Sequence, residues 1–470
     1  MDAASDNGAE AVVIGGMVLD INATPSMVAN PRTTTPGKVR YTLGGVARNI
    51  AECMSKLGAK PYMISAIGFD LAGSLLLEHW RSAGLSVEGI KRSQDIETAV
   101  VCNIFDGKGE LAAAVASVES IEKFLTPEWI QKFKYNIRSA PILMVDANLT
   151  PPALLASCGM ATECETSVWF EPVSVTKSMR IASVVKYVTY TSPNEDELIA
   201  MANALSCRDK FLPIQRDSGS NKFPIRSLFR ILKPPAWVLL EKGIEVVIVT
   251  VGPHGAFLCF KTINGSRKCN LSKNGPFSFS RRLLYEAINL SCPPNKILGP
   301  TPKSKGSNYN IAVHFPSLSA SVVRLTGSGD CLVGGAIASL CAGLDIMQSL
   351  AVGIAVAKGA VESEGNVPVE YELDRIADSF MMPEQSILER KSSSVKIHRP
   401  TPFPIVILGV NYIKYPHSFQ KNVELLHDIR AYDSAVSPTI GPIKLDIHVT
   451  INFDRQDLNI NKQKTIRINV

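Results

Sequence analysis

The chain has 470 residues, of which 46% are hydrophobic, and a formal net charge of +6. This length accommodates two average domains or one large α/β domain with additions, and the apolar fraction is enough for a substantial core. The small net charge, without an arginine–aromatic stripe or zinc-finger spacing, argues against a nucleic-acid partner.

Ten cysteines lie between Cys53 and Cys341, with no C-x-x-C pair among them. Such a scatter forms no compact disulfide framework and predicts reduced, mostly buried thiols. Because thiols persist in reducing compartments, we expect a cytoplasmic protein. A peroxisomal location is the alternative, although the chain ends in Ile468-Asn469-Val470 and not in a Ser-Lys-Leu signal.

The first ten residues form a polar tail, too short and too early for a signal sequence, and a buried strand is predicted directly after them. Short apolar runs then alternate with segments of helical period, such as residues 49–57 and 72–83. The predicted strands are residues 12–14, 62–67, 142–145, 168–170, 187–191 and 246–251. This alternation indicates the α/β class, with a mostly parallel sheet covered by helices on both faces.

Polar residues follow the first strand and open the first helix. Asp20 comes shortly after the strand at residues 12–14, and its carboxylate can accept hydrogen bonds from two vicinal sugar hydroxyls. Gly44 and Gly45 permit close approach of the backbone, and Asn49 opens the helix with an amide that donates and accepts. A Gly-Gly turn before a helix is by itself an ordinary turn, but with Asp20 it predicts a polyol pocket.

Residues 97–118 differ from the alternation of strands and helices in the rest of this region. Two β-rich runs flank the turn Asp106-Gly107-Lys108-Gly109, which predicts a hairpin. Such a hairpin forms either a small lid apart from the main sheet or an ordinary edge of that sheet.

Two later turns follow predicted strands. Asn194 and Glu197 lie three residues apart at the start of a helix, where acidic residues ordinarily complement the helix dipole. The functional alternative is that they organise a hydrated Mg²⁺ beside nucleotide phosphates, with Glu197 acting through water. The run Thr250-Val251-Gly252-Pro253-His254-Gly255 closes a strand with a sharp turn that can hold a nucleotide, and we expect His254 to be a turn residue.

Three segments depart from the α/β pattern. Residues 207–235 and 262–309 are rich in polar residues and proline, so we expect them to be inserted loops. Residues 383–470 form a C-terminal extension of unknown role, with β-like runs at residues 404–410 and 443–453. We expect this extension to make few contacts with the rest of the chain.

The most informative segment is Thr326-Gly327-Ser328-Gly329-Asp330, which precedes the small apolar run Cys331 to Ala336. The glycines let successive N–H groups point into one cavity at a helix N-terminus, which makes an anion site. Because phosphate repels a carboxylate, Asp330 there suggests a base that takes a proton from an alcohol attacking a phosphoryl group. The alternative is that Asp330 is an ordinary helix N-cap.

The apolar stretch of residues 331–360 is long enough to be compared with a membrane span. Gly343-Leu344-Asp345 and Gln348 interrupt it as a C-cap glycine and a new N-cap do. We therefore expect two buried helices and no membrane association.

These motifs, in this order, resemble those of the ribokinase-like (PfkB) kinases of carbohydrates and nucleosides. Gly44 to Asn49 is similar to the first signature of the family, Thr326 to Asp330 to the second, and Asn194 to Glu197 to its Asn-x-x-Glu motif. The resemblance covers residues 11–380 and implies one kinase domain: a three-layer α/β/α sandwich with a mostly parallel sheet and a small β lid. No Walker-type phosphate loop occurs, as is usual in this family.

The resemblance also implies cofactors and residue roles. ATP with Mg²⁺ would be the phosphoryl donor, bound through Asn194, Glu197, Thr250, Gly252, Gly255 and Thr326. Asp330 would be the general base, Gly327 to Gly329 with Ser328 the anion hole, and Asp20, Gly44, Gly45 and Asn49 the contacts to the substrate. Arg324 and Leu325 replace the Asp and small polar residue of the second signature, which leaves a monovalent cation in question.

Two segments narrow the substrate. Gly44 to Glu52, and Glu171 to Ser174 with Lys177, resemble the kinases of this family that act on the ribose 5′-hydroxyl of a C-nucleoside. Ribokinases, adenosine kinases and other sugar kinases share the scaffold and remain alternatives. A catalytically inactive member that acts as an interaction protein is a further one. The expected partners are thus a nucleoside or sugar and ATP, in a monomer or homodimer.

Overall fold

The computed structural model describes residues 11–28, 32–106, 111–206, 210–214, 224–262, 309–371, 376, 406–412, 444–449 and 464–469. The polar N-terminal tail and nearly all of the insertion predicted at 262–309 lie outside these residues. So does most of the C-terminal extension.

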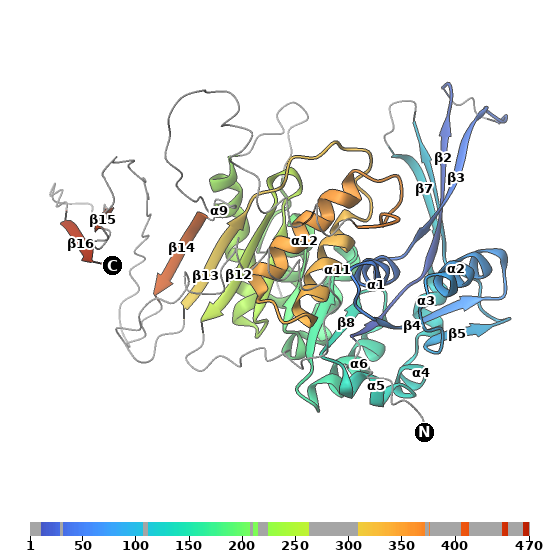
Figure 1. The fold of residues 1–470 in the computed structure, drawn as a ribbon, viewed down its shortest axis with the longest axis horizontal. Coiled ribbons are helices and arrows are strands. Elements are labelled where there is room, and N and C mark those ends of the chain that lie inside the picture. The colour runs from blue at the N-terminus through green and yellow to red at the C-terminus, as the bar shows by residue number, and fades with distance from the viewer. Residues whose placement is uncertain are drawn as a thin grey trace.

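Ten of the described strands form a large central sheet (Figure 1). Neighbouring strands from β9 to β5 run parallel, as do β9, β10 and β11, whereas β11 to β14 pair antiparallel. Across the sheet the order is β14 (Val406–Tyr412), β13 (Tyr309–Phe315), β12 (Ala256–Thr262), β11 (Val246–Thr250), β10 (Tyr190–Thr191), β9 (Ser167–Glu171), β8 (Ile142–Asp146), β1 (Val12–Ile14), β4 (Tyr62–Gly68) and β5 (Ile90–Ser93). The mostly parallel sheet confirms the predicted class.

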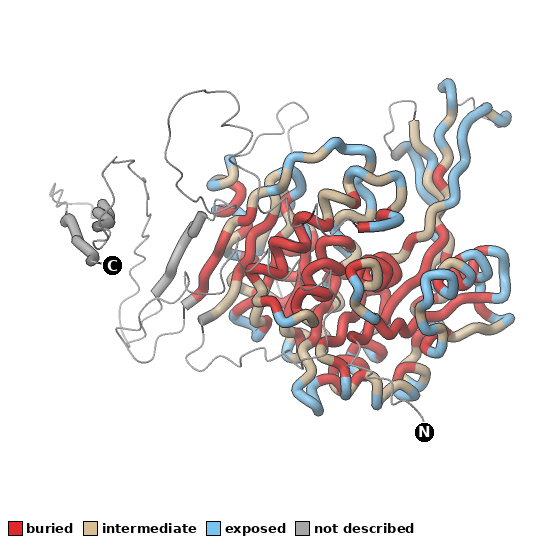
Figure 2. The backbone as a smooth tube through the Cα atoms, in the orientation of Figure 1, coloured by how far each residue is buried: buried red, intermediate tan, exposed pale blue. Residues whose placement is uncertain are grey.

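Helices cover both faces of this sheet, and a separate hydrophobic core lies under each layer. The buried residues are concentrated in the sandwich, whereas the outer part of a second, smaller sheet is exposed (Figure 2). One layer contains α1 (Val46–Lys56), α2 (Leu71–Ser82), α11 (Ser328–Cys341) and α12 (Ile346–Val361). The other contains α3 (Glu119–Phe124), α4 (Pro127–Gln131), α5 (Lys134–Ser139), α6 (Pro151–Thr162), α8 (Glu195–Ser206) and α9 (Ile225–Glu241). The short helix α7 (Val175–Ser178) precedes α8. The predicted α/β/α sandwich is therefore confirmed.

A smaller sheet stands away from the sandwich and forms the lid (Figure 1). Its strand order is β3 (Gly37–Gly44), β2 (Val18–Pro25), β6 (Val100–Phe105) and β7 (Leu111–Ser117). The β6–β7 pair is the predicted hairpin, but the prediction did not include β2 and β3. Most of β3 is exposed, so it carries no apolar run by which a strand is recognised.

The apolar stretch after Asp330 is divided as expected. Gly343 adopts a φ of 90° after α11, and the Asp345 side chain accepts hydrogen bonds from two backbone N–H groups at the start of α12. Gln348 completes a capping box there. Within the described ranges, no helix combines the length and apolarity needed to cross a membrane.

Two predictions about the segments outside the α/β pattern are wrong. Residues 225–235, expected in a loop, form the first part of α9, in which Pro234 and Pro235 are tolerated and Leu228, Phe229 and Leu232 are buried. The extension also makes a contact that was not expected, because β14 pairs with β13 and extends the central sheet by one strand. Farther on, β15 (Lys444–Val449) and β16 (Lys464–Asn469) pair with each other.

The cysteines agree with the predicted thiol state. Each of the seven described cysteines is free, and Cys53, Cys158, Cys259 and Cys331 are buried.

Candidate active site

The Gly-rich segment forms the start of α11. Gly327 is the residue before the helix and has a φ of 86°, a left-handed conformation that side chains other than glycine rarely adopt. A Cβ there would also lie 2.2 Å from the Asn366 carbonyl oxygen. Asp330 is the third residue of the helix and does not cap it, so the N-cap interpretation is wrong. The Ser328 hydroxyl donates to the Leu325 carbonyl (2.7 Å), and Thr326 is exposed.

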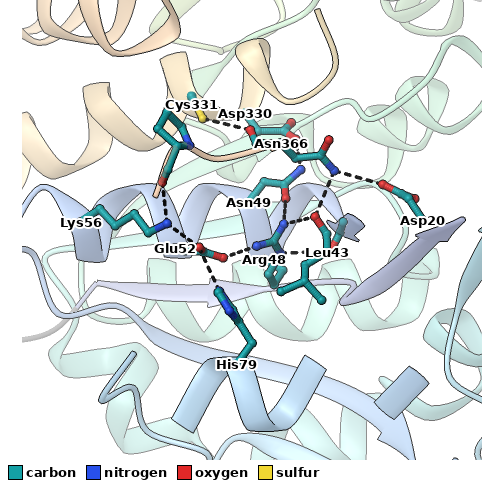
Figure 3. Close-up of polar contacts among 12 residues, drawn as sticks. Asp20, Leu43, Arg48, Asn49, Glu52, Lys56, His79, Asp330, Cys331 and Asn366 are labelled. Atoms are coloured by element: carbon teal, nitrogen blue, oxygen red, sulfur yellow. Dashed lines mark hydrogen bonds and ion pairs between the residues drawn. The ribbon is translucent and has the colours of Figure 1, made fainter. Parts of the chain in front are cut away.

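The carboxylate of Asp330 instead faces the helix α1. Asn49 donates from Nδ2 to Asp330 Oδ2 at 2.6 Å (Figure 3). Asn49 is the fourth residue of α1, not its first as predicted, and Cys53 follows it by one turn on the same face. A Cβ on Gly334, one turn beyond Asp330, would lie 2.8 Å from Cys53 Cβ. Gly334 thus lets α1 and α11 approach closely enough for the Asn49–Asp330 hydrogen bond.

The environment of Asp330 favours its protonated form. Burial raises the pKa of the half-buried Asp330 carboxyl to about 7, and the charges of Asp146 and Asp20 contribute to the increase. The hydrogen bond from Asn49 and the Arg48 charge act in the opposite direction. A carboxyl with a pKa near 7 can accept a proton at neutral pH and release it again.

The Gly44–Gly45 turn packs closely against one backbone group, the Gly16 carbonyl, and one side chain, the Asp20 carboxylate. Gly45 has a φ of 96°, and a Cβ there would lie 2.4 Å from the Gly16 carbonyl oxygen. A Cβ on Gly44 would lie 2.3 Å from Asp20 Oδ2. Position 45 therefore needs glycine, and Gly44 brings the backbone against the Asp20 carboxylate, which a larger side chain would displace.

Asp20 lies on the lid strand β2, not at the end of a central strand as its position in the sequence suggested. Its Oδ2 accepts a hydrogen bond from Asn366 Nδ2 at 3.0 Å, and Asn366 also donates to the Leu43 carbonyl at 3.0 Å. Burial raises the pKa of Asp20, while Asn366, Arg324 and Arg48 oppose the rise. Asn366 thus ties the base of the lid to the loop that follows α12.

Arg324, the residue that departs from the family signature, is half-buried in front of the Gly-rich segment. Its Nη1 donates to the Glu364 carbonyl at 3.1 Å and makes a long contact of 3.5 Å with Thr42 Oγ1 on the lid strand β3. Its charge also interacts with Asp20. A fixed positive charge therefore lies between the lid and α11.

The ends of the central strands contribute further acidic side chains. The buried Asp146, at the end of β8, accepts hydrogen bonds from the N–H groups of Gly16 (3.0 Å) and Asn148 (3.0 Å). Burial raises the pKa of Glu171, at the end of β9, and the charges of Glu197 and Asp330 raise it further. Strands β1 and β8 lie where the strand order reverses, which is where open α/β sheets bind ligands.

Asn194 and Glu197 form a capping box at the start of α8. Asn194 Oδ1 accepts from the N–H groups of Asp196 (3.0 Å) and Glu197 (2.9 Å), and Glu197 Oε2 accepts from the Asn194 N–H (2.9 Å). Thr250 lies beside Asn194 in a β-bridge. The structure thus brings together the two predicted nucleotide segments.

The turn after Thr250 also depends on glycine. Gly252 and Gly255 have φ values of 53° and 91°. A Cβ on Gly255 would lie 2.0 Å from the Phe315 carbonyl oxygen, so the turn packs directly against the end of β13. His254 is a half-buried residue of this turn, and its carbonyl contacts His314 Nε2.

The carboxylates do not form a metal cage. Within the described part of the chain, no three His, Cys, Asp or Glu side chains are placed to hold a metal ion together. Mg²⁺ usually keeps several waters and is bound through one or two carboxylates and substrate phosphates, and the Glu197 carboxylate lies at the start of α8, beside the predicted nucleotide turn.

Sequence reasoning missed three residues of the site. Asn366 lies in a loop without a recognised motif, and only its short distance from α12 could have suggested it. Asp146 ends an apolar strand, a signal that could have found it. Arg48 lies within the Gly44 to Asn49 motif, but no role was predicted for it from the sequence.

Residues 9–268 match the model of the pfkB family carbohydrate kinases. A pseudouridine kinase of Arabidopsis thaliana is 52% identical over 371 residues, which cover 78% of this chain and 94% of that protein. The chain belongs to the pfkB family. A pseudouridine kinase of Escherichia coli is 28% identical over 199 residues, which cover 42% of this chain and 63% of that protein.

Solved structures agree with pfkB membership at the level of the fold. The structure of Arabidopsis thaliana ribokinase complexed with ribose and ATP aligns with a TM-score of 0.57 and 15% identity, covering 79% of this chain and 99% of that one. A ribokinase of Thermotoga maritima aligns with a TM-score of 0.56 and 19% identity, with coverages of 79% and 99%.

Proposed function

We propose that this pfkB kinase is a pseudouridine kinase, which transfers the γ-phosphoryl group of ATP to the ribose 5′-hydroxyl of pseudouridine. The 52% identity to the Arabidopsis pseudouridine kinase, extending over 94% of that protein, carries the choice of substrate. The position of Asp330, at the N-terminus of α11 and opposite Asp20, supports phosphoryl transfer to an alcohol.

The ribose binds between the lid and α1. The Asp20 carboxylate accepts hydrogen bonds from two ribose hydroxyls, since it has two oxygens with free lone pairs beside the Asn366 bond. Gly44 and Gly45 let the sugar ring approach the backbone, and Asn49 contacts it from α1. The 5′-hydroxyl then lies near Asp330.

The transfer step is a single displacement. Asp330 accepts the proton of the 5′-hydroxyl as O5′ bonds to the γ-phosphorus, and the bond from this phosphorus to the β–γ bridging oxygen breaks to release ADP. The N–H groups of Gly327 to Gly329, at the positive end of α11, stabilise the charge on the transferring group. Most of the catalysis is thus positioning and electrostatic stabilisation.

The nucleotide lies along the ends of β10 and β11. Thr326, Thr250, Gly252 and Gly255 line its path, and the Asn194–Glu197 capping box presents the helix α8 to it. Mg²⁺ bound to the phosphates supplies positive charge to the transferring group. Glu197 can hold one water of this Mg²⁺ through Oε1, because the helix cap engages only its Oε2.

Arg324 makes a monovalent cation unnecessary in this proposal. Its guanidinium already places a fixed positive charge in front of the Gly-rich segment. We assign the kinase domain to residues 11–380, in a monomer or homodimer, with ATP and the nucleoside as its ligands.

A substrate panel tests the proposal. The purified chain is incubated with MgATP and pseudouridine, uridine, adenosine, ribose or fructose, and release of ADP is measured together with the mass of the product. We expect kcat/KM to be highest for pseudouridine. A preference for a free sugar would contradict the proposal, and ATP binding without transfer to any of these alcohols would favour the inactive interaction protein.

The matched control is another acid at a helix start. Asp330→Asn should fold and lose nearly all turnover, whereas Asp345→Asn, at the N-cap of α12, should keep turnover within about twofold because Asn caps a helix as well as Asp does.

A further inference from the structure

Arg48 lies directly behind Asn49, with its guanidinium buried under the Gly44–Gly45 turn; the residue is 2% exposed. Its Nε donates to the Gly44 carbonyl at 3.2 Å, and its Nη2 donates to the carbonyl of Leu43. The same Nη2 donates to Asn49 Oδ1, and Nη1 donates to Glu52 (Figure 3). All of these partners lie in or next to the segment that binds the ribose in our proposal.

The chemistry of these groups permits a single orientation of the Asn49 amide. Arg48 has only donors, and an ionised Asp330 has only acceptors. Asn49 lies between them, with Oδ1 toward Arg48 and Nδ2 toward Asp330. If the amide rotated by 180°, its NH₂ would face the guanidinium and its oxygen would face the carboxylate, and both contacts would become repulsive.

We propose that Arg48 is a positioning residue for the catalytic base, which fixes the Asn49 amide and thereby the Asp330 carboxylate. This inference rests on the proposed role of Asp330. Because the Asn49 NH₂ occupies Oδ2, that oxygen remains an acceptor, and the proton of the attacking hydroxyl goes to Oδ1. Arg48 therefore determines which carboxylate oxygen takes the proton, although it does not touch the substrate.

The charge of Arg48 is balanced inside the same network. Glu52, which is also buried, contacts Lys56 Nζ at 2.7 Å and His79 Nε2 at 3.0 Å in addition to Arg48. Burial opposes ionisation, but His79, Arg48 and Lys56 together lower the pKa of Glu52 to about 2. Glu52 therefore stays charged, and the guanidinium remains paired while it holds Asn49.

A double-mutant cycle separates positioning from a purely structural role. Arg48→Lys keeps the charge but loses the planar fork that reaches Asn49, Leu43 and Glu52 together. We expect this change to lower kcat about 10- to 100-fold, with the dissociation constant of MgATP within about twofold of the original. In the background of Asn49→Ala, the same change should lower kcat by no more than about twofold, because Arg48 then has no amide to orient.

Equal fold losses in both backgrounds, or an unchanged kcat in Arg48→Lys, would overturn the proposal. The matched control is Arg92→Lys. Arg92 is half-buried, whereas Arg48 is buried, and it likewise donates to a backbone carbonyl and a side chain, Gly68 O (3.2 Å) and Ser74 Oγ (3.0 Å), but it lies on the edge strand β5. The kcat of Arg92→Lys should stay within about twofold of that of the original chain.

Two further measurements keep the test decisive. If Arg48→Lys does not fold, the cycle is run with the double variant Arg48→Gln/Glu52→Gln, which removes both buried charges. This double variant should again lower kcat in the original chain but by no more than about twofold in the background of Asn49→Ala. A crystal structure of the variant gives a readout without turnover: Asn49 Nδ2 should move beyond hydrogen-bond distance of Asp330, and its retention at 2.6 Å would refute the assignment. Failure of the proposed function would appear separately, in the substrate panel of the unaltered chain.

Discussion

Replacing the base should stabilise the protein while removing its activity. Burial raises the pKa of Asp330 from 3.8 to about 7, so the folded state holds a proton between these pH values that the unfolded state has lost. Stability therefore falls as the pH rises from about 4 to 7. Three pKa units correspond to about 4 kcal/mol, and since Asp330 is only half-buried we expect about 2–4 kcal/mol of this loss. The asparagine in Asp330→Asn has no ionisable group, so this variant does not lose that stability as the pH rises.

The assay is urea unfolding of both proteins, without ligands, at several pH values between 4.5 and 8. The variant should exceed the original in free energy of unfolding by about 2–4 kcal/mol at pH 8, and this difference should shrink toward zero near pH 4. A difference that does not change with pH, or a variant that is less stable at pH 8, would refute the argument that Asp330 is held in a desolvated position.

Three more outcomes follow from the site. With pseudouridine as substrate, kcat/KM should rise about tenfold per unit below pH 7 and level off above it, because Asp330 accepts a proton only when ionised; a flat profile from pH 5.5 to 8 would contradict this. Gly334→Ala should separate α1 from α11, lower kcat at least about tenfold and cost about 1–3 kcal/mol in urea unfolding, whereas Gly159→Ala, in an open position on α6, should not destabilise. Replacing K⁺ by tetramethylammonium should change turnover less than about twofold, and a strict K⁺ requirement would show that Arg324 does not supply the charge.

The sequence was sufficient for the sandwich because each of its layers has a local signal. The predicted apolar strands correspond to β1, β4, β8, β9, β10 and β11, and the predicted segments of helical period include α1 and α2, whereas β5, β12 and β13 were not among the predicted strands. The lid was found only in part, since β3 is largely exposed and β2 mixes polar and apolar residues without a continuous apolar run. The helix α9 was missed because Pro234 and Pro235 suggested a loop, although its buried Leu and Phe residues pack against the sheet.

For the site, motif spacing identified the glycines and Asp330, whose backbone requirements are local. Contacts between segments that are distant in the sequence produce no motif or spacing by which they could be predicted. Nothing near Asn366 in the sequence indicates that it bonds Asp20, and nothing near Arg48 indicates that its fork orients Asn49 toward α11. Such roles depend on how α1, α11 and the lid meet, which only the three-dimensional packing decides.

The hydrogen bond between Asn49 and Asp330 joins residues that are 281 positions apart. During synthesis from the N-terminus, α1 and α2 emerge long before α11, the helix against which α1 packs most extensively. Contacts of such high sequence separation form late and slowly. A nascent or truncated chain that ends before α11 therefore lacks both the acid–base machinery and part of the cover of one sheet face, so catalytic competence and completion of that layer arise in the same folding event.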